Sequence, residues 1–411
     1  MTNNPALCAA TIVQERGHPC PREREHCADA DRNVHAPFCH AEQDAMSALV
    51  VRSYRPEDAA GARSVLAAAY GPAATPASVF DWWNFGCPLA ASGFQVAEVG
   101  GRIVGVQPME LFPYEWSGRR LTGAMLTGVV VHPEFRRRGL FSRLIGACEK
   151  EAWQRGADFI TTMPNERSRP GFLKLGYREP GRRQLLLLPL SASKLARRAV
   201  RWAPMALARA FRTHVSGAPA CCRLTASEQP KPATCRRPGL ELEILKQAPK
   251  DLDDLNEADQ QLFPGLRLAR SRAWWDWRYA ASPRSYQMLR LRDARGGTAG
   301  LVVTTLEQRG GLEVGYVVDW LARDANLIPD ILVGALGQLK EAGAAIAASV
   351  VSSDAQVRAL RSSGFCRVPH WAPLKRFFTL FKPAPTIATD LLERMSSIHS
   401  WHQTLGDWDN L

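Results

Sequence analysis

The chain has 411 residues, of which 46% are hydrophobic and 22% charged, and it carries a net charge of +12. A single hydrophobic core rarely grows past roughly 250–300 residues, so this length predicts two domains. There is no apolar run approaching the ~20 residues of a membrane-spanning helix and no apolar leader segment. We therefore exclude an integral helical membrane protein and expect reduced cysteines in a cytoplasmic protein.

Residues 1–47 differ in composition from the rest of the chain. They show no apolar periodicity and contain four cysteines and four histidines, which are Cys8, Cys20, Cys27, Cys39, His18, His26, His35 and His40. Both residue types are zinc ligands, but no Cys-x-x-Cys pair occurs and the gaps are long. We expect a disordered extension without a metal, or a wrongly assigned start before Met46. A zinc site is the alternative.

Residues 48–190 predict a first domain in which strands and helices alternate. The pattern predicts strands at 49–54, 95–99, 102–105, 121–131 and 159–163, helices at 58–69 and 140–155, an aromatic segment at 79–85, and closing strands after 176. Gly100-Gly101 indicates a hairpin turn, and Gly156 is a plausible helix C-cap. Together these elements predict an α/β fold with a mixed sheet.

The segment from Val129 to Ile145 joins a strand, a tight turn and a helix. A β-branched run ends at His132-Pro133, three arginines and Gly139 follow, and the apolar spacing then becomes helical. The N–H groups and dipole of a helix N-terminus favour an anion, and arginines match phosphate oxygens. The segment therefore predicts a phosphate site, with an ordinary basic turn as the alternative.

This segment resembles the acyl-CoA loop of the GCN5-related N-acetyltransferase (GNAT) superfamily. Arg136 and Gly139 take the first and fourth positions of its Arg/Gln-x-x-Gly-x-Gly/Ala motif, whereas Phe141 stands where Gly or Ala is usual. The resemblance implies that the strand pairs with the pantetheine arm and that turn amides hold the pyrophosphate. The implied cofactor-binding residues are Val129, Val130, Val131, Arg136, Arg137, Arg138, Gly139, Leu140, Phe141, Ser142 and Arg143.

A second segment, residues 159–177, resembles the later motif of the same superfamily. A strand precedes Pro164-Asn165, and a Leu-Gly-aromatic sequence closes the segment at Tyr177. This form is similar to that of a tandem subgroup associated with bacterial polysaccharide synthesis. The resemblance implies that Asn165 and Ser168 are catalytic and position the thioester or the CoA thiol. A helix N-cap is the alternative role for Asn165.

The usual acid and base of the superfamily are not matched. Phe172 stands where a tyrosine acid is frequent, and residues 124–131 lack the frequent glutamate. General acid–base catalysis needs groups that exchange protons. Glu110, Glu115 and Asp319 are candidate carboxylates from neighbouring strands, each with a structural role as the alternative.

Residues 191–238 form a basic connector. From 182 to 237 the chain has twelve Lys or Arg residues and a single acid, Glu228. Lys194, Arg198 and Arg201 fall on one helical face before Pro204. Two interpretations remain open, a solvated linker and a peripheral contact with an anionic membrane surface. No nucleic-acid-binding motif is present.

Residues 239–382 repeat the first domain, and 383–411 form a C-terminal tail. Trp277 follows Trp83 by 194 residues, and Gly300 follows Gly105 by 195. Residues 321–329 lack the Arg-x-x-Gly turn, so we expect a degenerate copy that does not bind acyl-CoA. The tryptophans Trp82, Trp83, Trp274, Trp275 and Trp277 are expected to pack helices between the domains, with sugar stacking as the alternative.

These observations predict two tandem acetyltransferase-fold domains, the second degenerate. The resemblance implies an N-acetyltransferase that moves an acetyl group from acetyl-CoA, a cosubstrate, to an amine or hydroxyl acceptor without a metal. An amino sugar or saccharide precursor as small-molecule acceptor rests on the resemblance alone. The alternatives are an aminoacyl or long-chain acyl transferase on a similar fold, and a non-catalytic acyl-CoA-binding scaffold.

Overall fold

The structure is a computed structural model, and it describes residues 49–71, 76–196, 240–369, 371–372 and 374–408. The predicted extension at 1–47, with its cysteines and histidines, lies outside the described residues. So does most of the basic connector, including Arg198 and Arg201 of the predicted basic helix.

The first copy of the fold follows the predicted order of elements. Its strands and helices are β1 (Leu49–Ser53), α2 (Ala59–Tyr70), α3 (Ala77–Phe85), β2 (Ala91–Ser92), β3 (Gln95–Val99), β4 (Arg102–Gln107), β5 (Met109–Trp116), β6 (Arg119–Leu126), β7 (Val130–Val131), α4 (Leu140–Gln154), β8 (Phe159–Thr162), α5 (Arg169–Lys174) and β9 (Arg178–Pro189). Gly100 and Gly101 have φ of 55° and 79°, as a two-residue hairpin turn requires. The predicted hairpin is thereby confirmed.

The second copy repeats this order, which confirms the predicted duplication. Its elements are β10 (Glu241–Leu245), α8 (Leu252–Leu262), β11 (Arg267–Leu268), α9 (Arg272–Trp275), β12 (Gln287–Arg292), β13 (Thr298–Arg309), β14 (Leu312–Ala322), α10 (Ile328–Glu341), β15 (Ile346–Val351), α11 (Asp354–Ser362), β16 (Cys366–Arg367) and β17 (Phe377–Pro383), and α12 (Thr389–Met395) follows.

Two tryptophans join the copies through reciprocal contacts. Trp82 Nε1 donates to the Trp277 carbonyl oxygen at 3.0 Å, and Trp277 Nε1 donates to the Trp82 oxygen at 3.2 Å. Their rings stack with centroids 5.0 Å apart. Such an exchange between equivalent residues is expected of a twofold-related interface. The separation of 195 matches the glycine offset, so Trp277 corresponds to Trp82 and not to Trp83, and the tryptophans pack the copies together as predicted.

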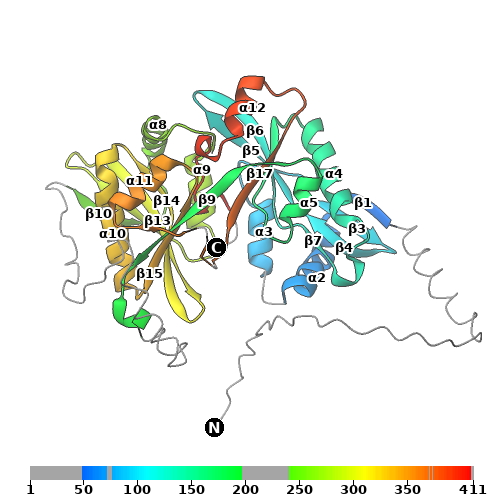
Figure 1. Cartoon of the computed structure of the whole chain (residues 1–411), viewed down its shortest axis with the longest axis horizontal. Helices are drawn as coiled ribbons and strands as arrows, with labels where there is room; N and C mark the ends of the chain where they lie inside the picture. Colours follow the sequence, from blue (N-terminus) through cyan, green and yellow to red (C-terminus); the bar gives the residue numbers. More distant parts are fainter. Residues whose placement is uncertain (1–48, 72–75, 197–239, 370, 373, 409–411) are drawn as a thin grey trace, which may run out of the picture. The chain divides into compact units, whose positions relative to one another are not determined.

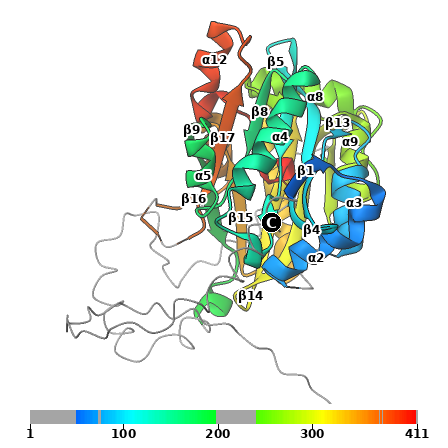
Figure 2. The same ribbon diagram turned by 90° about the vertical axis from the view of Figure 1, so that its right-hand side faces the viewer.

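The copies also exchange their last strands (Figures 1 and 2). Strand β9 of the first copy pairs with β15 of the second, where Gln184 to Pro189 face Val351 to Ile346. Strand β17 of the second copy lies between β8 and β9 of the first. One sheet therefore runs through both copies, and residues nearly 200 positions apart become neighbours in it.

The predicted strand at 121–131 is wrong as a single element, because it divides into β6 and β7. Gly128, with φ of 53°, lies in the break. Strand β6 belongs to the long sheet, whereas β7 pairs with β4 in a separate sheet of order β1-β3-β4-β7. The segment that pairs with β6 and β7 is also interrupted, at Pro108, which lies between β4 and β5. The Gln107 amide bridges both breaks by donating to the Thr127 oxygen (2.9 Å) and the Pro108 oxygen.

Candidate functional site

The turn after β7 has the strand, turn and helix that its sequence predicts. A 3-10 turn at Pro133–Phe135 leads to two residues with positive φ, Arg137 at 64° and Gly139 at 75°. Helix α4 then begins at Leu140, with no side-chain cap and no acid in its first turn. In the described part of the chain, the N–H groups of residues 140–142 donate to no backbone carbonyl. These amides form the kind of helix terminus that binds anions.

Arginines surround this turn. The Nε of Arg136 donates to the Val131 oxygen at 3.2 Å, and the Arg138 guanidinium lies 5.5 Å from the centre of the Phe135 ring. Arg137 and Arg143 are exposed. The cations stand beside the helix N-terminus and add to its positive potential.

Phe141, which departs from the motif, packs against residues of helix α5. Its ring meets the Phe172 ring edge to face at 5.1 Å. A Cβ at Gly171 would lie 2.8 Å from the Phe141 ring, so glycine provides the space that the ring occupies. The aromatic side chain thus packs between α4 and α5.

Two parallel strands of the first copy diverge next to this turn. Strands β6 and β8 pair from Gly123–Phe159 to Leu126–Thr162, and their pairing ends there. Beyond the break, His132 N–H donates to the Val104 oxygen on β4 at 2.8 Å. Because alternate N–H groups of a strand point in opposite directions, those of Val129 and Val131 point away from β4. A free strand edge therefore borders the gap, and such an edge binds extended ligands through main-chain hydrogen bonds.

A cavity of about 460 Å³ occupies the gap. Residues 126–129 line one side and residues 162–165 the other. Of the predicted site residues, Val129, Asn165 and Ser168 line the cavity, whereas the turn residues from Arg136 to Arg143 do not. The predicted residues thus form two groups, an anion site at the start of α4 and a cavity between the diverging strands.

Asn165 and Ser168 form one hydrogen-bonded unit. Asn165 Oδ1 accepts from the N–H groups of Arg167 and Ser168, both at 2.9 Å, and lies 3.2 Å from Ser168 Oγ. These bonds form a turn ahead of α5, whose N-cap is Ser168, so Asn165 is not at the N-cap position considered as its alternative. Among the described residues none accepts a hydrogen bond from its Nδ2, so the amide N–H groups remain able to donate to a ligand.

The charged residues that line the cavity are all basic. They are Arg183, Lys375 and Arg376, and the described lining contains no Asp, Glu, His or Cys. Of the candidate carboxylates, Glu110 is buried behind the wall, with Oε2 accepting from Thr127 Oγ1 at 3.4 Å. Glu115 accepts from Gln260, and Asp319 pairs with Arg270, so both have structural partners.

Arg183 is a lining residue that sequence reasoning placed in the basic run at 182–237. It lies instead inside β9, faces Phe377 of β17 and is only 6% exposed. Burial lowers the pKa of its guanidinium to about 10. The surrounding Gly-Arg-Arg-Gln sequence offers no signal of burial, because the covering strand comes from the second copy.

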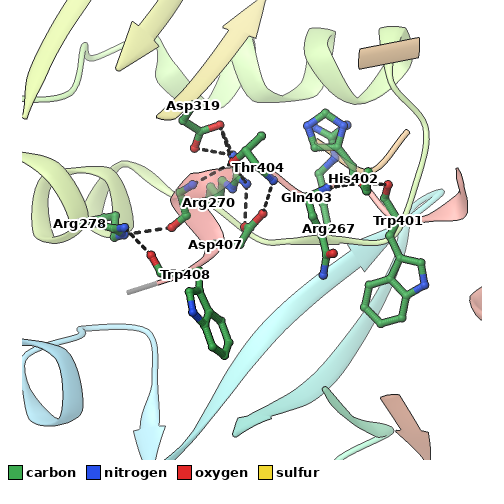
Figure 3. Close-up of polar contacts among 12 residues, drawn as sticks. Arg267, Arg270, Arg278, Asp319, Trp401, His402, Gln403, Thr404, Asp407 and Trp408 are labelled. Carbon is green, nitrogen blue, oxygen red and sulfur yellow. Dashed lines mark hydrogen bonds and ion pairs between the residues drawn. The ribbon is translucent and has the colours of Figure 1, made fainter. Parts of the chain in front are cut away.

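In the second copy the C-terminal tail fills the corresponding gap (Figure 3). Strands β14 and β15 pair only from Val314–Ile346 to Tyr316–Ala348. Beyond this point Thr404 donates to Asp319 at 3.2 Å, and Arg270 pairs with Asp319 and with Asp407, the latter at 2.7 Å. The tail thus closes the second copy with buried, mutually paired groups.

The same tail reaches the first copy. Its residues Leu405 and Trp408 line the cavity there. The Arg278 guanidinium secures this end by donating to the carbonyl oxygens of Gly406 at 3.0 Å and Trp408 at 2.7 Å. The second copy therefore contributes to the wall of the first copy's cavity.

Two kinds of site are not found in the described part of the chain. No group of three or more His, Cys, Asp or Glu side chains is placed to hold a metal ion there. No described helix combines the length and apolar character needed to cross a bilayer.

Comparison with known proteins identifies the architecture. Residues 50–179 match the family model described as an acetyltransferase (GNAT) domain. No curated protein matches the sequence. A GCN5-related N-acetyltransferase from Anabaena variabilis ATCC 29413 matches with a TM-score of 0.55 and 13% identity, over 82% of this chain and 72% of that one. Saccharomyces cerevisiae N-myristoyltransferase with bound myristoyl-CoA matches with a TM-score of 0.54 and 12% identity, over 86% and 84%.

A GCN5-related N-acetyltransferase from Kribbella flavida is also similar, with a TM-score of 0.52 and 15% identity over 82% of this chain and 71% of that one. Identities this low show a shared fold. Each alignment covers more residues than either copy contains, so the likeness extends across both copies.

Proposed function

Because residues 50–179 belong to the GNAT acetyltransferase family, whose fold supports acyl transfer from acyl-CoA, we propose that this protein transfers an acetyl group from acetyl-CoA to an amine. The observation that carries the proposal is the coincidence of two features in the first copy. A helix N-terminus suited to phosphate stands beside a free strand edge, and that edge borders a cavity. The second copy is closed at the equivalent place.

Each part of acetyl-CoA has a matching feature in the first copy. The pyrophosphate binds the amides at the start of α4 and the arginines beside them. The pantetheine amides pair with the outward N–H and C=O groups of Val129 and Val131. The thioester then lies in the cavity between β6 and β8, within reach of the Asn165–Ser168 unit.

Transfer requires a neutral amine, which attacks the thioester carbonyl. A C–N bond forms, the C–S bond breaks, the amine loses a proton and the CoA thiolate gains one. The amide of Asn165 donates to the developing oxyanion or to the departing sulfur. The basic lining favours the neutral form of the amine, because nearby positive charges lower the pKa of an ammonium group.

For the proton, the Thr127–Glu110 pair offers a carboxylate at the cavity wall. The amine transfers its proton through water or the Thr127 hydroxyl to Glu110, which burial isolates from bulk solvent. The missing tyrosine at Phe172 leaves protonation of the thiolate to water. An amino sugar or saccharide precursor is the acceptor that the sequence resemblance favours.

Calorimetric titration of acetyl-CoA into the full chain tests the donor site. We expect micromolar binding by the intact protein and at least tenfold weaker binding by an Arg136→Ala, Arg138→Ala double variant, because each lost charge-assisted hydrogen bond weakens binding by about 1.5–3 kcal/mol. Arg295→Ala, which removes an exposed arginine of the second copy, is the matched control and should bind normally.

Two outcomes would overturn the assignment. If the intact protein bound only acyl-CoA with long chains, the acetyl donor would be wrong. If no acyl-CoA bound, acyl transfer itself would be wrong. Release of CoA thiol in the presence of candidate amines separates an enzyme from a binding protein, since a scaffold binds acetyl-CoA without releasing thiol.

A further inference from the structure

Arg183 is a buried cation without a counter-ion. Its side chain is 6% exposed, and neither its Nε nor its Nη1 has a hydrogen-bond partner. Its guanidinium lies over the face of the Phe377 ring at 5.7 Å, a cation–π contact that supplies no counter-ion. An isolated buried charge is costly, so the molecule retains Arg183 against a free-energy penalty.

The other buried arginines show what a structural role looks like in this protein. Arg267 pairs with Asp259 at 2.9 Å, and Arg270 pairs with Asp319 and Asp407. Arg278 donates to two carbonyl oxygens of the tail. Arg183 makes no such ion pair or hydrogen bond with any residue that the structure describes.

Asp407, the acid that raises the pKa of Arg183, already forms an ion pair with another arginine. Asp407 raises the pKa of Arg183 slightly against the dominant lowering by burial, but its carboxylate pairs with Arg270 at 2.7 Å. With a pKa of about 10, Arg183 remains charged at neutral pH. Its charge is therefore uncompensated when the cavity holds no ligand.

Arg183 stands between two cavities. It lines the first, beside Asn165 and Ser168, and also a second cavity of about 450 Å³. The two share the wall formed by Arg183 and residues 375–377. The described lining of the second cavity contains no acidic residue, and its basic residues are Arg182, Arg183, Arg367, Lys375 and Arg376. Glu166 lies 3.7 Å from Arg376 and Glu179 lies 3.9 Å from Arg182, so these two charges are partly neutralised. The excess of basic residues still gives positive potential from the second cavity to the first.

We propose that the acceptor carries an anionic group, a carboxylate or a phosphate, and that Arg183 binds it while the acceptor amine faces the thioester. Lys375 and Arg376, on the shared wall, add attraction for the same group. This inference rests on the proposed acyl transfer and adds the class of acceptor, an amine with an acidic substituent. A guanidinium suits both anions, since carboxylate and phosphate oxygens both accept charge-assisted hydrogen bonds from it.

The test measures acceptor binding by calorimetry in the presence of CoA. The probes share one sugar scaffold, glucosamine as the neutral member, glucosamine 6-phosphate as the phosphate and muramic acid as the carboxylate. We expect the wild type to bind at least one anionic probe at least tenfold more tightly than glucosamine. The Arg183→Met variant should lose that preference, and Arg183→Lys should keep part of it.

Controls separate this role from a structural one. Arg178→Met removes an exposed arginine from the same strand and should leave the preference unchanged. The unfolding temperature of Arg183→Met should equal or exceed that of the wild type, because the variant removes an uncompensated buried charge. Its acetyl-CoA binding should be unchanged, which keeps the donor site's test independent of this one.

Comparing the two anionic probes identifies the anionic group of the acceptor. Tighter binding of glucosamine 6-phosphate alone would indicate a phosphate, and tighter binding of muramic acid alone would indicate a carboxylate. Equal binding of neutral and anionic probes by the wild type would overturn the proposal. So would an equal loss of all three probes in Arg183→Met, since that result would indicate a damaged cavity. Absence of acetyl-CoA binding by the wild type would instead contradict the proposed function.

Discussion

The two copies share one fold but differ at the place where two parallel strands diverge. In the first copy the gap between β6 and β8 holds a cavity, and in the second the tail fills the gap between β14 and β15. Both copies have a capped 3-10 turn followed by a helix without a side-chain cap, but α4 follows three arginines and has no acid in its first turn, whereas α10 has Asp330 there. Duplication thus preserved the scaffold while only one copy kept an open site.

The difference begins in two backbone breaks. At the offset of 195, Pro108 corresponds to Val303. The sheet register places Gly128 at Asp319, because Gly105 pairs with Val131 and its counterpart Gly300 pairs with Ala322. Val303 stays paired with Asp319, next to a register shift between Val303 and Thr304. Proline lacks an N–H and Gly128 adopts positive φ, so the first copy's sheet divides where the second copy's strands continue.

The buried charges differ in the same way. In the second copy, acids of the chain itself neutralise Arg270, whereas Arg183 at the first copy's cavity has no such acid. A buried charge that the chain satisfies stabilises the folded state, and one that it leaves unsatisfied indicates a ligand. Arg270 pairs with Asp407 of the tail, and Arg183 lines the cavity together with Leu405 and Trp408 of the same tail, which makes them a matched pair for mutation.

The largest expected effect comes from Arg270→Met. It leaves Asp319 and Asp407 buried without a cationic partner, so we expect the free energy of unfolding to fall by about 3–5 kcal/mol. Arg183→Met is expected to leave it unchanged or to raise it, because no ion pair is broken and an uncompensated buried charge is removed. Urea denaturation of both variants checks the contrast, and equal losses would contradict it.

A smaller effect is expected at the tryptophan pair. Trp82→Phe and Trp277→Phe each remove one of two reciprocal N–H donors, so each should lower the free energy of unfolding by about 1–2 kcal/mol. The two losses should agree within about 0.5 kcal/mol if the interface is symmetric. Urea denaturation measures both losses. A large loss of stability in only one of the two variants would contradict the equivalence of these residues.

The smallest expected effect is on the pH dependence of stability. It concerns Asp58 and Asp251, which precede the first helix of each copy. The Arg52 guanidinium, bonded at 2.7 and 2.8 Å, holds the pKa of Asp58 below its ordinary value. Burial raises the pKa of Asp251, but hydrogen bonds from Thr298 outweigh it and hold the pKa below the ordinary value.

A folded-state pKa below the unfolded value means that these carboxylates stabilise the protein above pH ~4 and lose that contribution as pH falls further. Asp58→Asn and Asp251→Asn should each lower stability by about 0.5–1.5 kcal/mol at pH 7 and flatten its decline below pH 4. Urea denaturation from pH 3 to pH 7 measures this. A decline as steep as that of the wild type in both variants would assign acid sensitivity to other groups.

Local sequence signals were sufficient for much of the fold and for the strand, turn and helix around Gly139. The β-branched run, Gly139 and the helical spacing of Leu140, Leu144 and Cys148 act within a few residues of one another, and the structure has the elements they predict. The offset of 195 similarly shows the duplication. The break at Gly128 was missed, because a β-branched sequence on both sides is compatible with a single strand.

The cavity depends on contacts between distant parts of the chain. Arg183 is buried because Phe377, 194 residues later, lies opposite it on the exchanged strand, and the tail reaches the first copy because Arg278 anchors it. By itself the sequence determined most strands and helices, the duplication and the turn before α4, because backbone propensities and periodicity act locally. Only the tertiary structure decided which charges are buried, which are paired and which copy remains open, because burial and pairing depend on partners that the fold brings together.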